Sequence, residues 1–522
     1  MVDNGKVFFA KQGDDEILSD KIYMLPGMAN RHGFICGATG TGKSVTLKVL
    51  AESFSALGVP VFMSDVKGDM AGIAVPGEDS ESMQKRIDRF GIRDEFKYQG
   101  YPVALYDIYQ EKGTSLRTTV SEMGPQLMAQ VLDMNDTQTE LLQVVFKIAD
   151  DQGLILTDTK DLKAMLQYAS DHSDEFKQDY GNISSQSVAT MIRGIVALEA
   201  EGADKFFGEP AIDIKDFFQK TSDGHGLITI LDAETLINQP RLYSAFMLYL
   251  LSELFEVLPE VGDPELPRIV FFFDEAHLLF KNASKSLLDK IEQVVKLIRS
   301  KGVSVFFVTQ SPGDIPNAVM SQLGNKIEHA LHAYTPAEQK VVKAAADAFR
   351  ENPEFKTIDL IQNLGTGEAV VSVLDEKGAP TVAEHAYILP PESRMGALSD
   401  DERAKCIKAC PFDKKYAESI DDISAYEVIN RATKKTVAKS DDSAGGTLAE
   451  TAQSVGGGIS EAAENLLGSS GVRKVARQTG GSIGREVGKA IGEAVLGKKG
   501  KTIGGNIGAE LGRNLMGTLM KK

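Results

Sequence analysis

The chain has 522 residues, of which 42% are apolar, so it can build the cores of two or three domains. Its net charge of −17 argues against a surface with general affinity for nucleic-acid phosphates, although a local basic channel is compatible with that charge. Three cysteines make neither a disulfide framework nor a convincing metal site, no apolar run approaches the length of a membrane span, and the N-terminus lacks a secretion signal, so we expect a cytoplasmic protein.

The first motif in the chain is a phosphate-binding loop. Residues 37–44 read GATGTGKS, which fits GxxxxGKS, between an apolar strand at 34–36 and a helical pattern at 45–57. Its glycines let backbone N–H groups turn inward onto phosphates, and the start of the helix adds partial positive charge. We expect Lys43 to reach the β- and γ-phosphates of ATP and the Ser44 hydroxyl to ligate Mg²⁺. The predicted nucleotide-binding residues are Gly37, Ala38, Thr39, Gly40, Thr41, Gly42, Lys43, Ser44 and Val45.

A second apolar strand is predicted at residues 59–63. It is followed by Asp65 and Lys67, which should lie on the same rim as the phosphate-binding loop, because ligands bind beyond the carboxyl ends of parallel strands. The pattern alone leaves the role of both residues undefined.

The segment 119–205 has the pattern of several helices. We expect helices at 124–132, at 137–150 with Asp136 as N-cap, at 161–168 and at 185–199. These helices would form an inserted all-α subdomain. The chain then returns to a strand at 227–232 and to a long apolar helix at 241–258.

Residues 268–275 read RIVFFFDE, an apolar run too short for a buried helix that ends in two acids. This pattern is typical of a Walker B strand. Asp274 is the predicted Mg²⁺ ligand, through water, and Glu275 is the predicted base that polarises the attacking water. Because a kinase needs no such glutamate, the pair favours a nucleotide hydrolase. The alternative is that Glu275 only caps the helix that follows.

Residues 274–277 also spell DEAH, the motif of a group of RNA helicases. The long interval from residue 37 and the lack of a later arginine-rich motif exclude that group. We therefore expect His277 to be a packing or solvated residue on the next helix.

A third buried strand is predicted at residues 303–310, reached from the Walker B strand through a helix at 287–300. Its last residue, Gln310, should emerge near Glu275 and is a candidate sensor of hydrolysis, or alternatively only caps the next loop. The segment between the two strands is basic and could line a pore that contacts DNA, or it could be an ordinary solvated helix face. The candidate DNA contacts are Lys281, Lys285, Lys290 and Lys296.

The remaining chain changes in character after residue 400. Before it, segments 365–372 and 381–388 predict an antiparallel edge to the sheet. After it, we expect a helical extension at 401–435, a flexible linker at 436–470 and a Gly-rich basic tail at 471–522. Self-association, DNA contact and peripheral contact with an anionic membrane all remain open for the tail.

Four stretches together resemble one known family: the loop GATGTGKS preceded by His32, the segment DVKGD at 65–69, FFFDEAHLLF around the two acids, and RSKGVSVFFVTQSP at 299–312. They are similar to the HerA-like branch of the HerA/FtsK ATPases, and more closely to the bacterial YjgR-type HerA-like helicase proteins. The resemblance covers residues 5 to 400. It implies a RecA-like core, a hexameric ring and ATP-driven movement on double-stranded DNA. Since the loop begins at residue 37, we expect the N-terminal β-barrel of archaeal HerA to be missing.

The expected fold class is α/β, a RecA-like P-loop NTPase core with an inserted all-α subdomain and a Gly-rich C-terminal tail. The core is expected to comprise residues 1–118 and 206–400. The expected function is Mg²⁺-dependent ATP hydrolysis by a homo-oligomer that acts on DNA. Two alternatives stay open: an assembly ATPase that remodels a protein substrate, and a nucleotide-dependent structural or interaction protein.

The sequence motifs hold no arginine that could neutralise the γ-phosphate within the chain. A neighbouring subunit should therefore complete the site. Arg299 and Arg394 are the candidates for this task.

Overall fold

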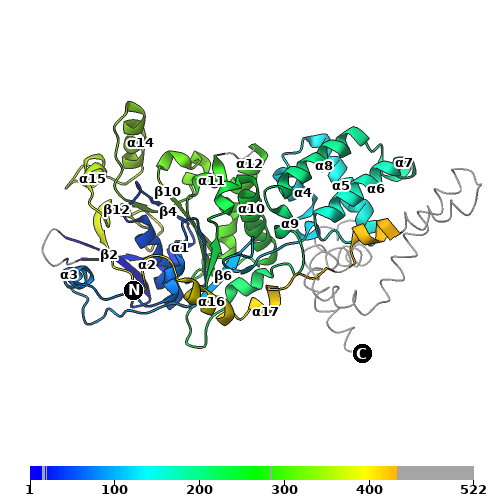
Figure 1. The fold of residues 1–522 in the computed structure, drawn as a ribbon. Coiled ribbons are helices and arrows are strands. Elements are labelled where there is room, and N and C mark those ends of the chain that lie inside the picture. Colours follow the sequence, from blue (N-terminus) through cyan, green and yellow to red (C-terminus); the bar gives the residue numbers. More distant parts are fainter. Residues whose placement is uncertain (14–17, 19, 282–284, 422, 432–522) are drawn as a thin grey trace, which may run out of the picture.

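The computed structural model describes residues 1–13, 18, 20–281, 285–421 and 423–431 (Figure 1). The predicted linker and Gly-rich tail lie outside the described residues. None of the helices in the described part of the chain combines the length and apolar character needed to cross a bilayer.

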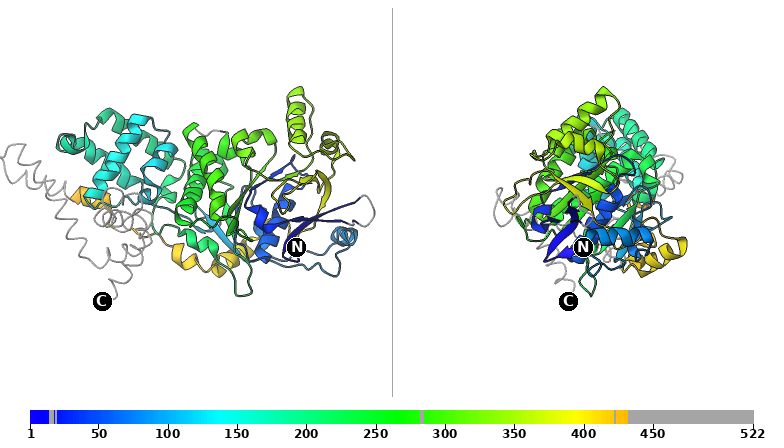
Figure 2. Two further views of the ribbon diagram at one scale, coloured as in Figure 1. Left: turned by 180° about the vertical axis from the view of Figure 1, so that it is seen from behind. Right: turned by 90° about the vertical axis from the view of Figure 1, so that its left-hand side faces the viewer.

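The fold is built on a single sheet of 13 strands. The molecule is long in the side view of Figure 2 and compact in the end view. Its mostly parallel α/β architecture confirms the predicted fold class. Eight strands form a parallel section, in the order β11 (Asn325–Glu328), β4 (Gly33–Cys36), β10 (Val303–Thr309), β9 (Ile269–Phe273), β5 (Val61–Asp65), β8 (Ile228–Asp232), β6 (Val103–Asp107) and β7 (Thr114–Ser115).

Five further strands continue the sheet beyond β11 in antiparallel fashion. They are β12 (Glu368–Ser372), β13 (Glu384–Ile388), β2 (Lys6–Gln12), β1 (Val2–Asp3) and β3 (Asp20–Met24). The pairing of β12 with β13 confirms the predicted antiparallel edge. The three N-terminal strands were not predicted, and they extend the same sheet.

The central strands are buried on both faces. All five residues of β9 have no solvent exposure, and their side chains alternate between two cores: Phe271 and Phe273 face one, Val270 and Phe272 the other. Helix α2 (Lys43–Ala56) contributes to the second core, and α10 (Pro240–Val257) and α12 (Lys285–Ile298) to the first. Cover on both faces explains why these strands are runs of apolar residues rather than alternating ones.

Between β7 and β8 the chain forms a body of helices at one end of the molecule, on the right in Figure 1. Its helix α4 begins at Val120, four residues before the predicted start, and bends at Gly124 and Pro125. The N-cap of α5 is Asn135 and not Asp136 as predicted, because the Asn135 and Gln138 side chains form a capping box. The helices are α4 (Val120–Val131), α5 (Asp136–Asp151), α6 (Thr159–Asp171), α7 (Ser173–Tyr180), α8 (Ser185–Glu199) and α9 (Ala203–Phe206).

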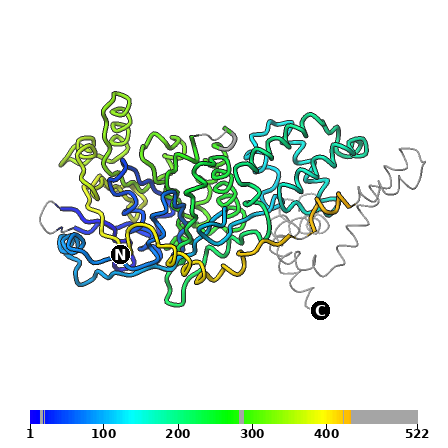
Figure 3. The backbone as a smooth tube through the Cα atoms, viewed as in Figure 1, coloured from blue at the N-terminus to red at the C-terminus, as the bar shows by residue number. Residues whose placement is uncertain are grey.

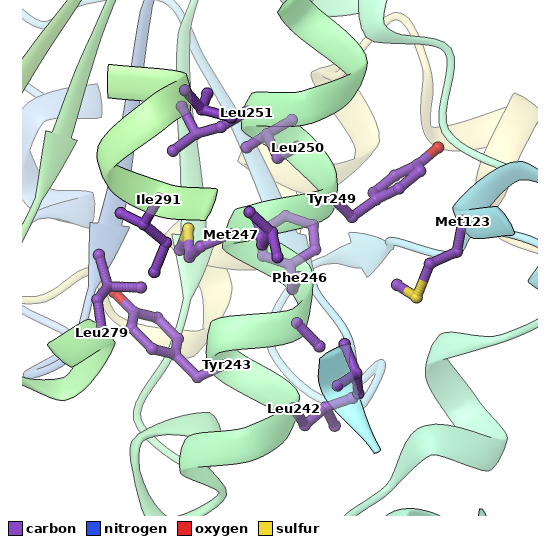
Figure 4. Packing of buried hydrophobic residues seen from close by; sticks show 14 of the residues in the cluster. Met123, Leu242, Tyr243, Phe246, Met247, Tyr249, Leu250, Leu251, Leu279 and Ile291 are labelled. Carbon is purple, nitrogen blue, oxygen red and sulfur yellow. The ribbon is translucent and has the colours of Figure 1, made fainter. Parts of the chain in front are cut away.

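Helix α10 joins this helical body to the sheet. Figure 4 shows Met123 of α4 beside α10 on one side and Leu279 and Ile291 on the other. All of these side chains are at most 3% exposed, and burying one large apolar side chain is worth about 1.5–3 kcal/mol. The helical body and the helices behind the Walker B strand therefore share one core.

The remaining helices are α1 (Pro26–Ala29), α3 (Glu81–Phe90), α11 (His277–Phe280), α13 (Asn317–Met320), α14 (Pro336–Asp347), α15 (Thr357–Asn363), α16 (Asp400–Ala409) and α17 (Asp413–Tyr416). Of these, α14 and α15 lie at the antiparallel end and α16 and α17 along the lower side of the sheet, whereas α11 lies beside α10 and α12 (Figure 1).

The segment after β13 runs back along the molecule from the antiparallel end to the helical body, as the tube in Figure 3 shows. At its start, the carboxylate of Glu52 in α2 accepts the backbone N–H of Glu392 at 2.9 Å. At its end, Asp161 in α6 accepts the backbone N–H of Tyr426 at 2.8 Å. The segment thus ties the two ends of the fold together.

Candidate nucleotide-binding site

The phosphate-binding loop lies between β4 and α2, at the carboxyl edge of the parallel sheet. Gly37 has φ +153° and Gly42 has φ +123°; a Cβ on Gly37 would lie 2.5 Å from the His329 Cβ, and one on Gly42 would lie 3.2 Å from the Gly367 Cα. No side chain caps the start of α2 at Gly42. Its first backbone N–H groups are therefore the free donors that an anion needs, and the crowded loop accepts only glycine at these positions.

Lys43 folds over this loop. Its side chain is 5% exposed, and Nζ donates to the carbonyl oxygens of Gly37 at 2.6 Å and Ala38 at 2.9 Å. Burial, together with the nearby ammonium of Lys67, lowers the pKa of Lys43. The ammonium thus lies directly at the loop that would cradle the phosphates.

His329, at the end of β11, braces the loop from behind. Its Nε2 accepts the hydroxyl of Thr46 at 2.8 Å, and Nδ1 donates to the carbonyl of Glu368 at 2.7 Å, which assigns the tautomer because the carbonyl can only accept. Burial lowers the pKa of His329 to about 4, so the ring is neutral. The sequence analysis missed this residue, since its only signal was a position beyond a strand end.

Asp274 and Glu275 follow β9 on the same edge. The backbone N–H of Asp274 donates to Ser64 Oγ on β5, which ties the two strand ends together at 3.2 Å. Asp274 is buried, and this burial raises its pKa to about 7. The carboxylate of Asp274 and the hydroxyl of Ser44 would together form a set of oxygen ligands that suits Mg²⁺. Ser44, the predicted second ligand, lies with Val45 in the first turn of α2.

The carboxylate of Glu275 is the centre of a polar cluster, although the residue is buried and holds a left-handed backbone with φ +48°. Gln310 Nε2 donates to Oε1 at 2.9 Å and to Oε2 at 3.2 Å. Lys67 Nζ lies 3.0 Å from Oε1, and His277 Nδ1 lies 3.4 Å from Oε2. Burial opposes the charge, but the donors from Gln310 and Lys67 bring the pKa of Glu275 below its ordinary value. The carboxylate is therefore ionised at neutral pH.

Two members of this cluster make contacts that the sequence did not predict. His277 lies on the helix after the strand, as expected, and its ring also approaches the Glu275 carboxylate. Lys67, whose role was left undefined, forms an ion pair with it. The available signal for Lys67 was its position two residues after Asp65, the last residue of strand β5.

Gln310 connects this cluster to the phosphate-binding loop. Its Oε1 accepts the hydroxyl of Thr39 at 3.3 Å, while its Nε2 donates to Glu275. This is possible because β10 lies between β4 and β9 in the sheet. The amide thus contacts both the predicted phosphate-binding loop and the predicted base.

The two arginine candidates pair with carboxylates of their own chain. Arg299 binds Asp263 through Nε and Nη2, at 2.8–3.1 Å, in η4 (Arg299–Lys301). Because η4 precedes the parallel strand β10, it lies at the opposite edge from the phosphate-binding loop. Arg394 forms two hydrogen bonds with Glu402, at 2.7 and 3.0 Å.

The candidate DNA contacts lie along one stretch after the Walker B strand. Lys281 follows α11, whereas Lys285, Lys290 and Lys296 lie on α12. Lys285 and Lys290, together with Gln130 of α4, line a polar groove of about 430 Å³. Asp289 also lines this groove, so acids are interleaved with the lysines.

The family profile described as Helicase HerA-like C-terminal matches residues 11–522. The plasmid coupling protein TrwB in complex with ADP and Mg²⁺ has 15% identity, over 76% of this chain and 98% of that chain, with a TM-score of 0.48. VirB4 of Thermoanaerobacter pseudethanolicus has 15% identity, over 77% of this chain and 99% of that chain, with a TM-score of 0.47. No curated protein matches the sequence.

Proposed function

The chain belongs to the Helicase HerA-like C-terminal family of P-loop ATPases, and from this premise we propose that it is a Mg²⁺-dependent ATP hydrolase that moves along or remodels double-stranded DNA. We further propose that it works as a homo-oligomer, a hexameric ring. The observation that carries the hydrolase proposal is the chain of contacts from Thr39 through Gln310 to the ionised carboxylate of Glu275.

In this proposal the phosphates of ATP bind at the start of α2. The free N–H groups of its first turn and the Lys43 ammonium hold the phosphate oxygens. Ser44 and Asp274 would hold Mg²⁺, which supplies positive charge to the β- and γ-phosphates.

Glu275 acts as the base in the proposed reaction. Its ionised carboxylate accepts a proton from the attacking water, and the amide of Gln310 orients both the carboxylate and the γ-phosphate side of the loop. A base for water distinguishes this site from that of a kinase, which transfers the phosphoryl group to a substrate hydroxyl. This chemistry supports hydrolysis.

The DNA-directed part of the proposal rests on the family and on charge. Lys285 and Lys290 present basic groups along α12, which follows the Walker B acids in the chain and packs against the first core. In this proposal, a movement at Glu275 during hydrolysis is transmitted through α12 to the bound DNA. Phosphate contacts of this kind weaken steeply as salt is raised.

The test is the ATPase rate of the full chain with and without duplex DNA, at low and at moderate salt. We expect DNA to raise the rate at low salt and to lose this effect as salt rises. A Mg²⁺-dependent rate that no DNA changes would overturn the DNA-directed part and favour a protein substrate. A chain without measurable ATPase activity would overturn the whole proposal.

A further inference from the structure

Lys67 is a charged residue of the site that has no role in the reaction proposed above. Its Nζ lies 3.0 Å from Oε1 of Glu275, and its side chain is 40% exposed, whereas that of Glu275 is 5% exposed. The cation therefore lies at the solvent side of the buried base. An ion pair so placed contacts the space through which a γ-phosphate and an attacking water would reach Glu275.

The backbone around Lys67 is held in place by hydrogen bonds to Asp65. The Asp65 carboxylate accepts the N–H groups of Lys67 at 3.2 Å, Gly68 at 2.7 Å and Met70 at 2.9 Å, which closes the loop after β5 into a tight turn. Gly68 has φ +73°, in the left-handed region that favours glycine. Because β5 pairs directly with β9, this turn is held one strand away from the Walker B acids.

The proposed reaction needs a cation that stabilises the negative charge on the γ-phosphoryl oxygens. In the transition state of phosphoryl transfer, negative charge spreads over the γ-oxygens. A cation that contacts these oxygens stabilises the transition state and raises the rate strongly. Arg299 and Arg394 are each engaged by a carboxylate of their own chain, Asp263 and Glu402. Lys67 is already at the base, on a flexible stem of four carbons that can exchange one anionic partner for another.

We propose that Lys67 is a catalytic residue that leaves Glu275 to bind the γ-phosphoryl group within the same chain. The inference rests on the proposed ATPase function. The water oxygen bonds to the γ-phosphorus, the bond from that phosphorus to the bridging oxygen breaks, and its electron pair leaves with ADP. One water proton passes to Glu275. Lys67 keeps its protons and exchanges the Glu275 carboxylate for a γ-oxygen.

This exchange also couples nucleotide binding to the base. While Lys67 and Glu275 are paired, the ammonium occupies one carboxylate oxygen that a water would otherwise use. Binding of the γ-phosphate removes the ammonium and exposes that oxygen to water. The base is thereby freed only when the substrate is present, which suppresses proton transfer without ATP.

The test uses Lys67→Met and Lys67→Arg in the full chain, with Lys85→Met as matched control, since Lys85 is an exposed lysine of α3. We expect Lys67→Met to lower kcat on the order of 100-fold, with ADP affinity within threefold of wild type and with an unchanged thermal melt. Arginine should restore part of the rate, and the control should be normal.

A second measurement separates a cation that touches phosphate from one that only holds the base. ADP with aluminium fluoride and Mg²⁺ mimics the reacting phosphoryl group, and its affinity is compared between Glu275→Gln and Glu275→Gln with Lys67→Met. We expect the added change to weaken this complex by at least tenfold while leaving ADP affinity alone. No added loss would mean that Lys67 acts only through Glu275, and would overturn the inference while wild-type ATPase activity still supports the proposed function.

Discussion

Gln310 donates from Nε2 to both carboxylate oxygens of Glu275, at 2.9 and 3.2 Å, and thereby joins the ends of β10 and β9 through their side chains. The other end of the same amide accepts the hydroxyl of Thr39 in the phosphate-binding loop. One side chain thus spans the two parts of the site. If ATP binds at this loop as proposed, a change at its γ-phosphate can reach Glu275 through Gln310.

Replacing the two central residues should separate binding from hydrolysis. Lys43→Ala removes the ammonium at the loop and should abolish nucleotide binding or turnover. Glu275→Gln should keep ATP binding but block hydrolysis, because only the lost carboxylate can take the proton of the attacking water. Equilibrium binding of a fluorescent ATP analogue and steady-state ATPase rates measure the two effects. A native hydrolysis rate in Glu275→Gln would show that another group is the base.

Gln310→Ala should lower kcat by about 10–100-fold with little change in ATP affinity. The substitution removes both hydrogen bonds to Glu275 and the contact with Thr39, so the base loses its orientation while the phosphate-binding groups remain. Gln186→Ala, an exposed position in α8, is the matched control. A fall in affinity with an unchanged kcat would assign Gln310 to binding instead.

Glu328, at the end of β11, should make stability depend on pH. Burial raises its pKa to about 8, against 4.5 for an ordinary glutamate. Between these values the unfolded chain releases a proton that the folded chain keeps, so the folded state loses stability as pH rises from about 4.5 to about 8. Glu328→Gln has no titratable group at this position. Relative to the wild type, its free energy of unfolding should therefore increase as pH rises through this range, by roughly 2 kcal/mol or more at pH 8 and by little at pH 5.

Denaturant unfolding of both proteins at several pH values measures this difference. Glu140→Gln, an exposed position in α5, should show no such trend. A stability difference that stays constant from pH 5 to pH 8 would mean that Glu328 is ionised in the folded protein.

The two arginine candidates can be separated from their own ion pairs. If Arg299 completes a neighbouring site, Arg299→Ala should lower the ATPase rate while Asp263→Ala, which breaks the same exposed pair, should leave it near normal. Arg394→Ala and Glu402→Ala form the corresponding test. The rate per chain should also rise with protein concentration as the oligomer forms. Equal effects of both members of each pair, together with a rate independent of concentration, would exclude completion of the site by a neighbour.

Two basic regions should contribute separately to DNA binding. Lys285→Glu with Lys290→Glu should remove stimulation by DNA and leave basal hydrolysis intact, because these side chains line a groove away from the phosphate-binding loop. Deleting residues from 471 should weaken DNA affinity and flatten its salt dependence, by about 0.9 in the log–log slope for each lost phosphate contact. Fluorescence anisotropy with labelled duplex over a salt series measures both. Unchanged affinity after both alterations would favour a protein substrate.

Local patterns were sufficient to predict several elements. The apolar runs at 59–63, 227–232, 268–275 and 303–310 correspond to β5, β8, β9 and β10, because strands covered on both faces must be apolar throughout. Helix starts were less accurate. Asn135 and Asp136 are adjacent, and both have side chains that can cap a helix. Asn135 is the N-cap because its side chain and that of Gln138 form a reciprocal pair, which the sequence alone did not reveal.

The sequence by itself determined that the chain has a P-loop and a Walker B strand, since each is a short contiguous pattern with its own local chemistry. The sequence also predicted that Gln310 would emerge near Glu275, as it does. Only the tertiary structure decided that β10 lies between β4 and β9, which brings Gln310 to Thr39 as well. It also decided that Lys67 and Glu275, far apart in the chain, form an ion pair. Strand order and such contacts arise from the pairing of segments distant in sequence, and no local pattern of residues encodes which strands become neighbours.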